Sequence, residues 1–143
     1  MKRLILIIAS MLMGVNCFAE SMPFDMNKCL DTIKLAESSG RDSCIGDNGK
    51  SRGAYQIQER TWKQYSRLNW LKYTAIPKDS RLVASMMVSD IVRHVKKFHL
   101  EEWESNPYAI VCMHYNCGIN TKHSLNWWIK NNKNKAYKTT YES

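Results

Sequence analysis

Residues 33–58, IKLAESSGRDSCIGDNGKSRGAYQIQ, place one carboxylate at the end of an apolar helix face and follow it with a glycine-punctuated loop. Glu37 comes seven residues after Leu30 and four after Ile33, so it shares their helix face and is predicted to point toward the interior. Burial among apolar side chains favours a neutral carboxyl and raises its pKa, as a general acid near neutral pH requires. Glu37 is therefore a candidate catalytic acid, and an ordinary solvent-facing glutamate is the alternative interpretation.

Outward from this stretch, helical spacing accounts for most of the chain. The first helix is expected over residues 26–39, between an Asp25 N-cap and a Gly40 stop. Later helices are expected over residues 60–68, 79–98 and 106–118, followed by a last helix capped by Thr121 and a frayed polar tail over residues 130–141. The helix over residues 79–98 is expected to turn a regular apolar stripe to the core: Val83, Met87, Ile91, Val95 and Phe98.

Strand signals are sparse, because no segment shows sustained apolar–polar alternation. The one candidate is Ser51 to Gln58, where a short hairpin would lie beside the helix that carries Glu37. With 143 residues, 44% of them hydrophobic, the chain is long enough for one proper core. We therefore predict a mainly α fold of the α+β kind, a single helical domain over residues 20–143 with a small β-hairpin.

Residues 1–19 have the features of a signal peptide. Lys2 and Arg3 precede an apolar run over residues 4–15, and Cys17-Phe18-Ala19 fits a cleavage site. The run is shorter than the ~20 residues that span a bilayer, so export to the periplasm or beyond is expected, without stable membrane insertion after cleavage. An uncleaved anchor and a lipoprotein lipidated at Cys17 are weaker alternatives.

The charge balance is basic throughout. Loss of Lys2 and Arg3 with the signal lowers the net charge from +8 to +6. An exported basic protein suits an anionic partner such as cell-wall polymer, a membrane surface or nucleic acid, although the charge by itself does not choose among them and serves solubility as well.

Four cysteines remain after signal cleavage, an even number that suits an oxidising compartment: Cys29, Cys44, Cys112 and Cys117. Helix positions five residues apart point about 140° away from each other, which disfavours a bridge between Cys112 and Cys117 and the complementary bridge between Cys29 and Cys44. Bridges from the first helix and its loop to the 112–117 segment are therefore favoured.

A metal site is the alternative to disulfides as a role for these cysteines, together with the histidines. The chain has no C-x-x-C pair, and His94, His99, His114 and His123 do not repeat a ligand spacing. Neither a metal site nor a cofactor is therefore predicted.

Four short motifs follow one another in the chain: ESSG at 37–40, GDNG at 46–49, GAYQI at 53–57 and HYNCG at 114–118. Over about residues 26–120 their order and spacing resemble those of the soluble lytic transglycosylase and goose-type lysozyme group. Each motif alone is weak, whereas four in the right order are much more specific. His114 stands where the group usually has a small residue, and Tyr55 where it often has an apolar one, so the fine shape of the cleft is expected to differ.

The resemblance implies a lysozyme-like fold with a groove for peptidoglycan glycan strands. It implies cleavage of the β-1,4 bond between N-acetylmuramic acid and N-acetylglucosamine, with Glu37 as the acid. It favours the cell-wall polymer over nucleic acid as partner, and a monomer that needs no cofactor is expected. Service to a cell-envelope machine, remodelling, defence and predation stay open as biological roles.

The second half of the reaction separates two outcomes. In a hydrolase another carboxylate directs water, whereas in lytic transglycosylases the sugar's own 6-hydroxyl attacks and the same glutamate acts as base. Asp47 matches an aspartate of the goose-type enzymes, but Asp-Asn-Gly is also strong turn chemistry. Gln58 stands where those enzymes have a further aspartate, which favours transglycosylation over hydrolysis.

The resemblance also implies contacts around the acid. Ser38 and Gln56 would hydrogen-bond the acetamido sugar, the backbone of Gly53, Ala54 and Tyr55 would line the cleft, and Tyr115 would hold the Glu37 carboxyl, with Asn116 beside it. For Tyr115 and Asn116 a core aromatic and a helix C-cap are the structural alternative. A non-catalytic peptidoglycan-binding module is the alternative to an enzyme, and an acidic residue at position 37 argues against it.

Overall fold

The structure is a computed structural model that describes residues 23–142, and the predicted signal peptide lies outside the described residues. Mainly helical, with one small three-stranded antiparallel sheet, it confirms the predicted fold class. The elements in chain order are α1 (Met26–Ser38), β1 (Ile45–Gly46), the 3-10 turn η1 (Asp47–Gly49), β2 (Ser51–Arg52), β3 (Ile57–Gln58), α2 (Glu59–Tyr65), α3 (Trp70–Tyr73), α4 (Pro77–Phe98), α5 (Leu100–Ser105), α6 (Pro107–Cys117), α7 (Leu125–Asn131) and α8 (Lys135–Glu142).

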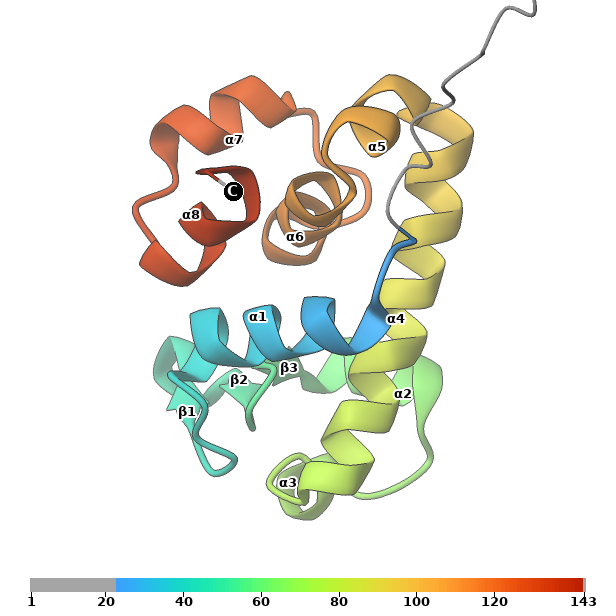
Figure 1. The fold of residues 1–143 in the computed structure, drawn as a ribbon. Coiled ribbons are helices and arrows are strands. Elements are labelled where there is room, and N and C mark those ends of the chain that lie inside the picture. The colour runs from blue at the N-terminus through green and yellow to red at the C-terminus, as the bar shows by residue number, and fades with distance from the viewer. Residues whose placement is uncertain (1–22, 143) are drawn as a thin grey trace, which may run out of the picture.

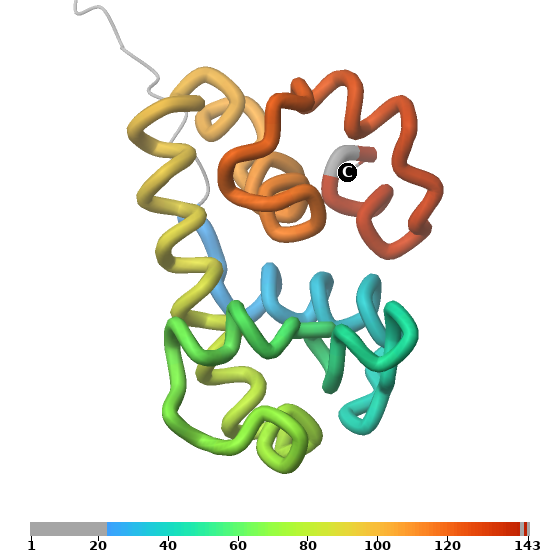
Figure 2. Tube along the Cα trace, turned by 180° about the vertical axis from the view of Figure 1, so that it is seen from behind, coloured from blue at the N-terminus to red at the C-terminus, as the bar shows by residue number. Residues whose placement is uncertain are grey.

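Helix α1 lies between two groups of elements (Figure 1). The helices α6, α7 and α8 lie on one side of it, the small sheet with α2 and α3 lies on the other, and the long α4 runs along the edge of both. The view from behind shows the same arrangement (Figure 2). Contacts join α1 to α8, α4 and α6, so this helix is central to the packing. The largest buried side chains of the core are Trp62, Trp128, Tyr55, Tyr137, Leu30, Ile33, Ile57 and Ile110.

The first helix has the predicted ends. Asp25 Oδ1 accepts hydrogen bonds from the backbone N–H groups of Asn27 and Lys28, at 2.8 and 3.2 Å, which satisfies two of the free donors of the first turn. At the other end Ser39 and Gly40 both adopt left-handed backbone conformations that stop the helix.

The sheet contains the predicted hairpin and one strand more. Strand β2 pairs antiparallel with β3, with Ser51 opposite Gln58, and also with β1, with Gly46 opposite Ser51. The turn between β2 and β3 needs Gly53, because its φ is +79° and an added Cβ would lie 2.1 Å from the Thr74 carbonyl oxygen. Two-residue strands are too short to show alternation, which is why β1 escaped prediction.

Helices α4 and α6 confirm their predicted signals. Pro77 is the first residue of α4, and Asn106 caps α6 by accepting a hydrogen bond from the Ala109 backbone N–H at 3.0 Å. The predicted stripe of α4 is correct at Val83, Ile91 and Val95 and wrong at Phe98, which is 61% exposed. Phe98 is the last residue of the helix. The short helices α3 and α5 were not predicted.

The C-terminal part corrects two predictions. Ser124, rather than Thr121, caps α7, since its side chain accepts from the Trp127 backbone N–H at 3.1 Å. Residues 135–142 form α8 instead of a frayed tail, and this helix packs against α1 and α6. The reason is tertiary packing: Tyr137 is 1% exposed and packs edge-on against Trp128. The polar sequence around Tyr137 does not reveal that this side chain will be buried.

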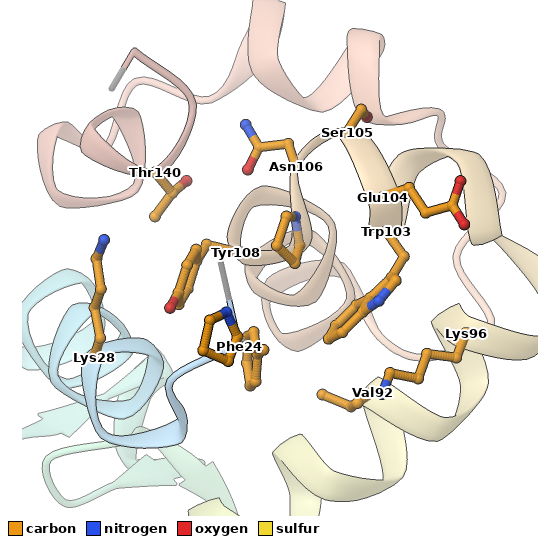
Figure 3. A pocket seen from close by; sticks show the side chains of 12 residues that line it. Phe24, Lys28, Val92, Lys96, Trp103, Glu104, Ser105, Asn106, Tyr108 and Thr140 are labelled. Carbon is orange, nitrogen blue, oxygen red and sulfur yellow. The ribbon is translucent and has the colours of Figure 1, made fainter. Parts of the chain in front are cut away.

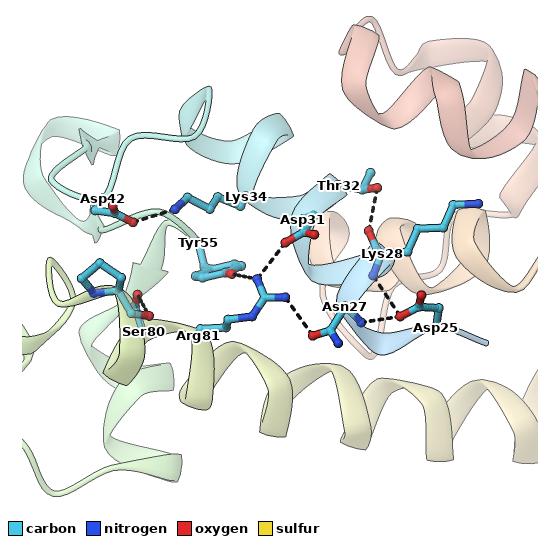
Figure 4. Close-up of polar contacts among 11 residues, drawn as sticks. Asp25, Asn27, Lys28, Asp31, Thr32, Lys34, Asp42, Tyr55, Ser80 and Arg81 are labelled. Atoms are coloured by element: carbon cyan, nitrogen blue, oxygen red, sulfur yellow. Dashed lines mark hydrogen bonds and ion pairs between the residues drawn. The ribbon is translucent and has the colours of Figure 1, made fainter. Parts of the chain in front are cut away.

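A polar network ties α1 to α4 (Figure 4). Arg81 of α4 donates to Asp31 and Asn27 of α1 and, at 3.0 Å, to the hydroxyl of Tyr55. Farther along α1, Lys34 pairs with Asp42 of the following loop at 2.8 Å. These contacts hold the loop that carries the sheet against the helix. Across residues 23–142, no helix combines the length and apolar character needed to cross a membrane.

Candidate active site

Glu37, in the last turn of α1, opens onto a groove of about 700 Å³ between the sheet and α6. Besides Ile57 and Met87, the lining is dominated by polar side chains and backbone, which suits a ligand rich in hydroxyl and amide groups. The lining residues are Glu37, Asp47, Ser51, Gln56, Ile57, Gln58, Thr61, Met87, Tyr115, Asn116, Cys117 and Gly118.

The Glu37 carboxyl is held by two side chains from distant parts of the chain. The Tyr137 hydroxyl of α8 donates a hydrogen bond to Glu37 Oε1, and the Asn116 side chain of α6 also hydrogen-bonds the carboxyl. Burial raises the pKa of Glu37 and is the dominant influence, while the two hydrogen bonds oppose it. The net result is a raised pKa, as predicted for a carboxyl that has to carry a proton near neutral pH.

A hydrogen bond from Trp128 fixes the orientation of the Asn116 side chain. The Trp128 indole N–H donates to Asn116 Oδ1 at 3.2 Å, and an indole N–H can only donate. The Asn116 oxygen is therefore engaged away from the acid, and its NH₂ group is the part free to donate to Glu37. Such a donor steadies the carboxylate that remains once the proton has left.

Asp47 belongs to the same groove. Its backbone is left-handed, with φ 51°, and its Oδ2 accepts a hydrogen bond from the Ser51 hydroxyl at 2.5 Å. The negative charge of Asp47 contributes to the raised pKa of Glu37. The turn chemistry predicted for Asp-Asn-Gly is therefore present, and the carboxylate also reaches the groove that Glu37 lines.

Gln56 both lines the groove and braces its wall. The side-chain NH₂ donates to the carbonyl oxygens of Gly53, at 2.9 Å, and Cys44, at 3.2 Å. This side chain lies so close to Gly46 that an added Cβ there would be 2.0 Å from Gln56 Oε1. A side chain at position 46 would therefore have to displace the Gln56 side chain, whose NH₂ group is engaged by the two backbone carbonyl oxygens.

Tyr115 does not hold the acid in the way that was predicted. Its hydroxyl donates to the Tyr55 carbonyl oxygen at 2.8 Å, so it joins α6 to the β2–β3 turn while one face lines the groove. Tyr55 turns its own hydroxyl to Arg81 on the other side of the fold. The hydroxyl that holds Glu37 belongs to Tyr137.

Ser38, Gly53, Ala54 and Tyr55 are not among the groove-lining residues, unlike Glu37, Asp47, Gln56, Tyr115 and Asn116. Ser38 is 3% exposed and its hydroxyl donates to the Lys34 carbonyl oxygen at 2.9 Å, within its own helix. Its role is therefore to complete the end of α1. Sequence reasoning missed the roles of Tyr137, which lay in the segment expected to fray, and of Ser51, Thr61 and Met87, which lie outside the four motifs. Cys117 lies in the HYNCG motif but was considered only as a disulfide candidate.

The four cysteines of the described residues, Cys29, Cys44, Cys112 and Cys117, are free thiols, so the structure contains neither of the predicted disulfides. Two of these cysteines are neighbours. Cys29 of α1 and Cys112 of α6 are both fully buried, and a hydrogen bond between their thiols contributes to a pKa of Cys112 well above its usual value. Cys112 is fully buried, whereas Cys117 lines the groove. The contact agrees with the predicted direction of pairing, from the first helix to the 112–117 segment.

A second hollow of about 680 Å³ lies at the junction of the N-terminal segment with α4, α5 and α6 (Figure 3). Its walls are aromatic: the Phe24 ring packs against Trp103 and Tyr108, with ring centroids 5.3 and 5.1 Å apart. These rings anchor the entry to α1 by packing on one another. Glu104 is its only carboxylate, and that residue has no donor pair comparable to Tyr137 and Asn116 in the described residues.

Searches of protein-family models, curated proteins and solved structures find no match to this chain.

Proposed function

We propose that the protein is an exported peptidoglycan glycosidase that cleaves the β-1,4 bond between N-acetylmuramic acid and N-acetylglucosamine. The observation that carries this proposal is Glu37: a partly buried carboxyl with a raised pKa, steadied by two donors, at the wall of an open polar groove. Glycosidic cleavage needs this kind of acid, because a proton must reach the leaving oxygen as the sugar approaches an oxocarbenium-like state. The basic charge of the chain suits an anionic wall polymer.

In the proposed first step, Glu37 donates its proton to the glycosidic oxygen while that oxygen's bond to the anomeric carbon breaks. The carboxylate left behind accepts hydrogen bonds from Tyr137 and Asn116. In the second step, the 6-hydroxyl of the muramoyl sugar attacks the anomeric carbon and gives its proton to Glu37. An intramolecular hydroxyl held close to the reacting carbon competes well with water through its high effective concentration.

Asp47 supports hydrolysis as the second candidate. It is the other carboxylate that lines the groove, and a carboxylate there can direct water. Against this role, its Oδ2 is already engaged by the Ser51 hydroxyl, and Gln58 supplies an amide farther along the same wall. Transglycosylation is therefore the outcome we propose.

The first test is Glu37→Gln, measured as loss of turbidity of purified sacculi. Removal of the acid should lower the rate by ~10²- to 10⁴-fold, because an amide cannot deliver the proton. Glu59→Gln is the matched control, since Glu59 pairs with Lys63 on the exposed face of α2 outside the groove, and it should keep the wild-type rate. A Glu37→Gln protein that retains more than about a tenth of the rate would move the acid elsewhere.

Thermal unfolding controls for the fold. A carboxyl whose folded pKa is raised contributes stability below its unfolded pKa, and this contribution is lost as pH rises through the folded pKa. Glu37→Gln should therefore be no less stable than wild type at pH 7.

The second test is mass spectrometry of the soluble products. Transglycosylation should release 1,6-anhydro-muramoyl ends, whereas hydrolysis adds one water and leaves a reducing end. Mostly reducing ends would favour the hydrolase, and in that case Asp47→Asn should abolish cleavage. Under the proposed mechanism Asp47→Asn retains the anhydro products.

A further inference from the structure

Three histidines from three elements meet on the side of the fold formed by α4, α5 and α6. His94 belongs to α4, His99 stands between α4 and α5, and His114 belongs to the last turn of α6. The ring centroids of His94 and His114 are 5.3 Å apart and those of His99 and His114 are 5.0 Å apart. One ring nitrogen from each histidine lies within 4.8 Å of the other two.

Of the three histidines, His114 is the hardest to account for as an ordinary core residue. It is 1% exposed, and within residues 23–142 neither of its ring nitrogens makes a hydrogen bond of normal geometry; the Gly118 and Ile119 backbone supplies only weaker contacts. Leaving a buried polar group unpaired costs about 1–3 kcal/mol, so such groups are rare unless something satisfies them. A bound ligand that accepts a nitrogen lone pair would remove this penalty.

The cluster can be reached by a cation from solvent. Neutral imidazoles each offer one lone pair. His94 and His99 are only partly buried, which leaves a path for an ion to enter from solvent.

We propose that His94, His99 and His114 form a binding site for a divalent transition-metal ion such as Zn²⁺. Imidazole nitrogens bind zinc at about 2.0–2.1 Å, which places ligand atoms of a tetrahedral site roughly 3.4 Å apart. Nitrogens within 4.8 Å of one another reach that spacing by small side-chain rotations. Three imidazole nitrogens without thiolate or several carboxylates favour zinc, nickel or copper over magnesium and calcium.

Glu102 is the positioning residue of this site. Its Oε1 lies 3.9 Å from His99 Nδ1, and carboxylates commonly orient the histidines that bind metal through their other nitrogen. The site connects α4, the start of α5 and the end of α6. Because Tyr115 and Asn116 directly follow His114, a bound ion would also fix the end of α6 that lines the groove. The inference does not depend on the activity proposed for that groove.

The spacing argument from sequence missed this group. The positions 94, 99 and 114 do not form a repeated ligand pattern, and only the α4–α5 corner and the packing of α6 bring them together. The prediction of no metal site was therefore based on a local pattern that this cluster does not use.

The test is zinc binding to untagged protein that has been stripped with a chelator, followed by calorimetric titration with ZnCl₂. One ion should bind per chain and should raise the unfolding temperature. His94→Ala and His99→Ala should each weaken binding by at least about a hundredfold, and Glu102→Gln by about ten- to a hundredfold. Both histidines are partly exposed, so these variants should retain the circular dichroism of the metal-free wild type.

His123→Ala is the matched control, because His123 stacks on Trp127 away from the cluster, with centroids 3.6 Å apart, and it should bind zinc like wild type. Glu37→Gln should also bind zinc normally, which separates this test from that of the groove. Co²⁺ substitution should give the visible absorption of a tetrahedral nitrogen site. Absence of stoichiometric binding, or binding that survives His94→Ala and His99→Ala, would overturn the proposal.

Discussion

The Glu37 carboxyl is subject to opposing influences from individual neighbours. Burial and the Asp47 charge raise its pKa, whereas the hydrogen bonds from Tyr137 and Asn116 lower it. A general acid is active only while protonated, so the alkaline limb of the activity profile should follow the pKa of Glu37. Each neighbour can therefore be tested by the direction in which its removal moves this limb.

Tyr137→Phe and Asp47→Asn should move the alkaline limb in opposite directions. Loss of the Tyr137 hydroxyl removes a donor that favours the carboxylate, so the pKa of Glu37 rises and the limb moves to higher pH. Loss of the Asp47 charge lowers that pKa and moves the limb to lower pH. The measurement is the pH dependence of sacculus cleavage; a common direction for both variants would contradict the assignment of Glu37 as the acid.

At the scale of the structural elements, the β2–β3 turn depends on a single glycine. Gly53 has a φ of +79° and lies against the Thr74 carbonyl, whereas Gly40, with a φ of +82°, has open space where a Cβ would go. The two glycines therefore separate the cost of backbone conformation from the cost of close packing.

Gly53→Ala should be much more destabilising than Gly40→Ala. The left-handed conformation alone should cost about 1 kcal/mol at Gly40, while the clash at Gly53 should bring the total to the order of 3 kcal/mol. Urea unfolding with unchanged slope measures both values. Equal losses would show that the turn can shift away from Thr74 without cost.

Helix α8 shows why some helices cannot be predicted from the local sequence. Its sequence is polar, and an isolated helix of eight residues is not stable in water. It forms because Tyr137 fits between α1 and α6, where its ring meets Trp128 and its hydroxyl meets Glu37. The same contact supplies the most direct support of the candidate acid.

For the molecule as a whole, the contact between α1 and α6 joins residues far apart in the chain. Cys29 and Cys112 meet at this contact, and we expect oxidation to join them. A bridge between them would close a loop of roughly 80 residues and stabilise the fold by about 4 kcal/mol in the chain-entropy model. It would hold the helix that bears Glu37 against the helix that bears Asn116.

Peptide mapping of oxidised protein under non-reducing conditions should therefore find Cys29 linked to Cys112. Cys29→Ser should abolish that link and lower the unfolding temperature of the oxidised protein, while under reducing agent the two proteins should differ much less. A link between Cys29 and Cys44, or between Cys112 and Cys117, would contradict the geometric argument.

The amino-acid sequence by itself determined the helices with strong caps and the hairpin. It also determined the position of Glu37 on an inward-facing stripe and the direction of its pKa shift. These features depend on periodicity and on neighbours along the chain. Tertiary structure alone decided that α8 forms, that Tyr137 rather than Tyr115 supports the acid, and that His94, His99 and His114 meet. These features arise from contacts between segments as many as 100 residues apart, and no local pattern records which distant side chain will fill a given space.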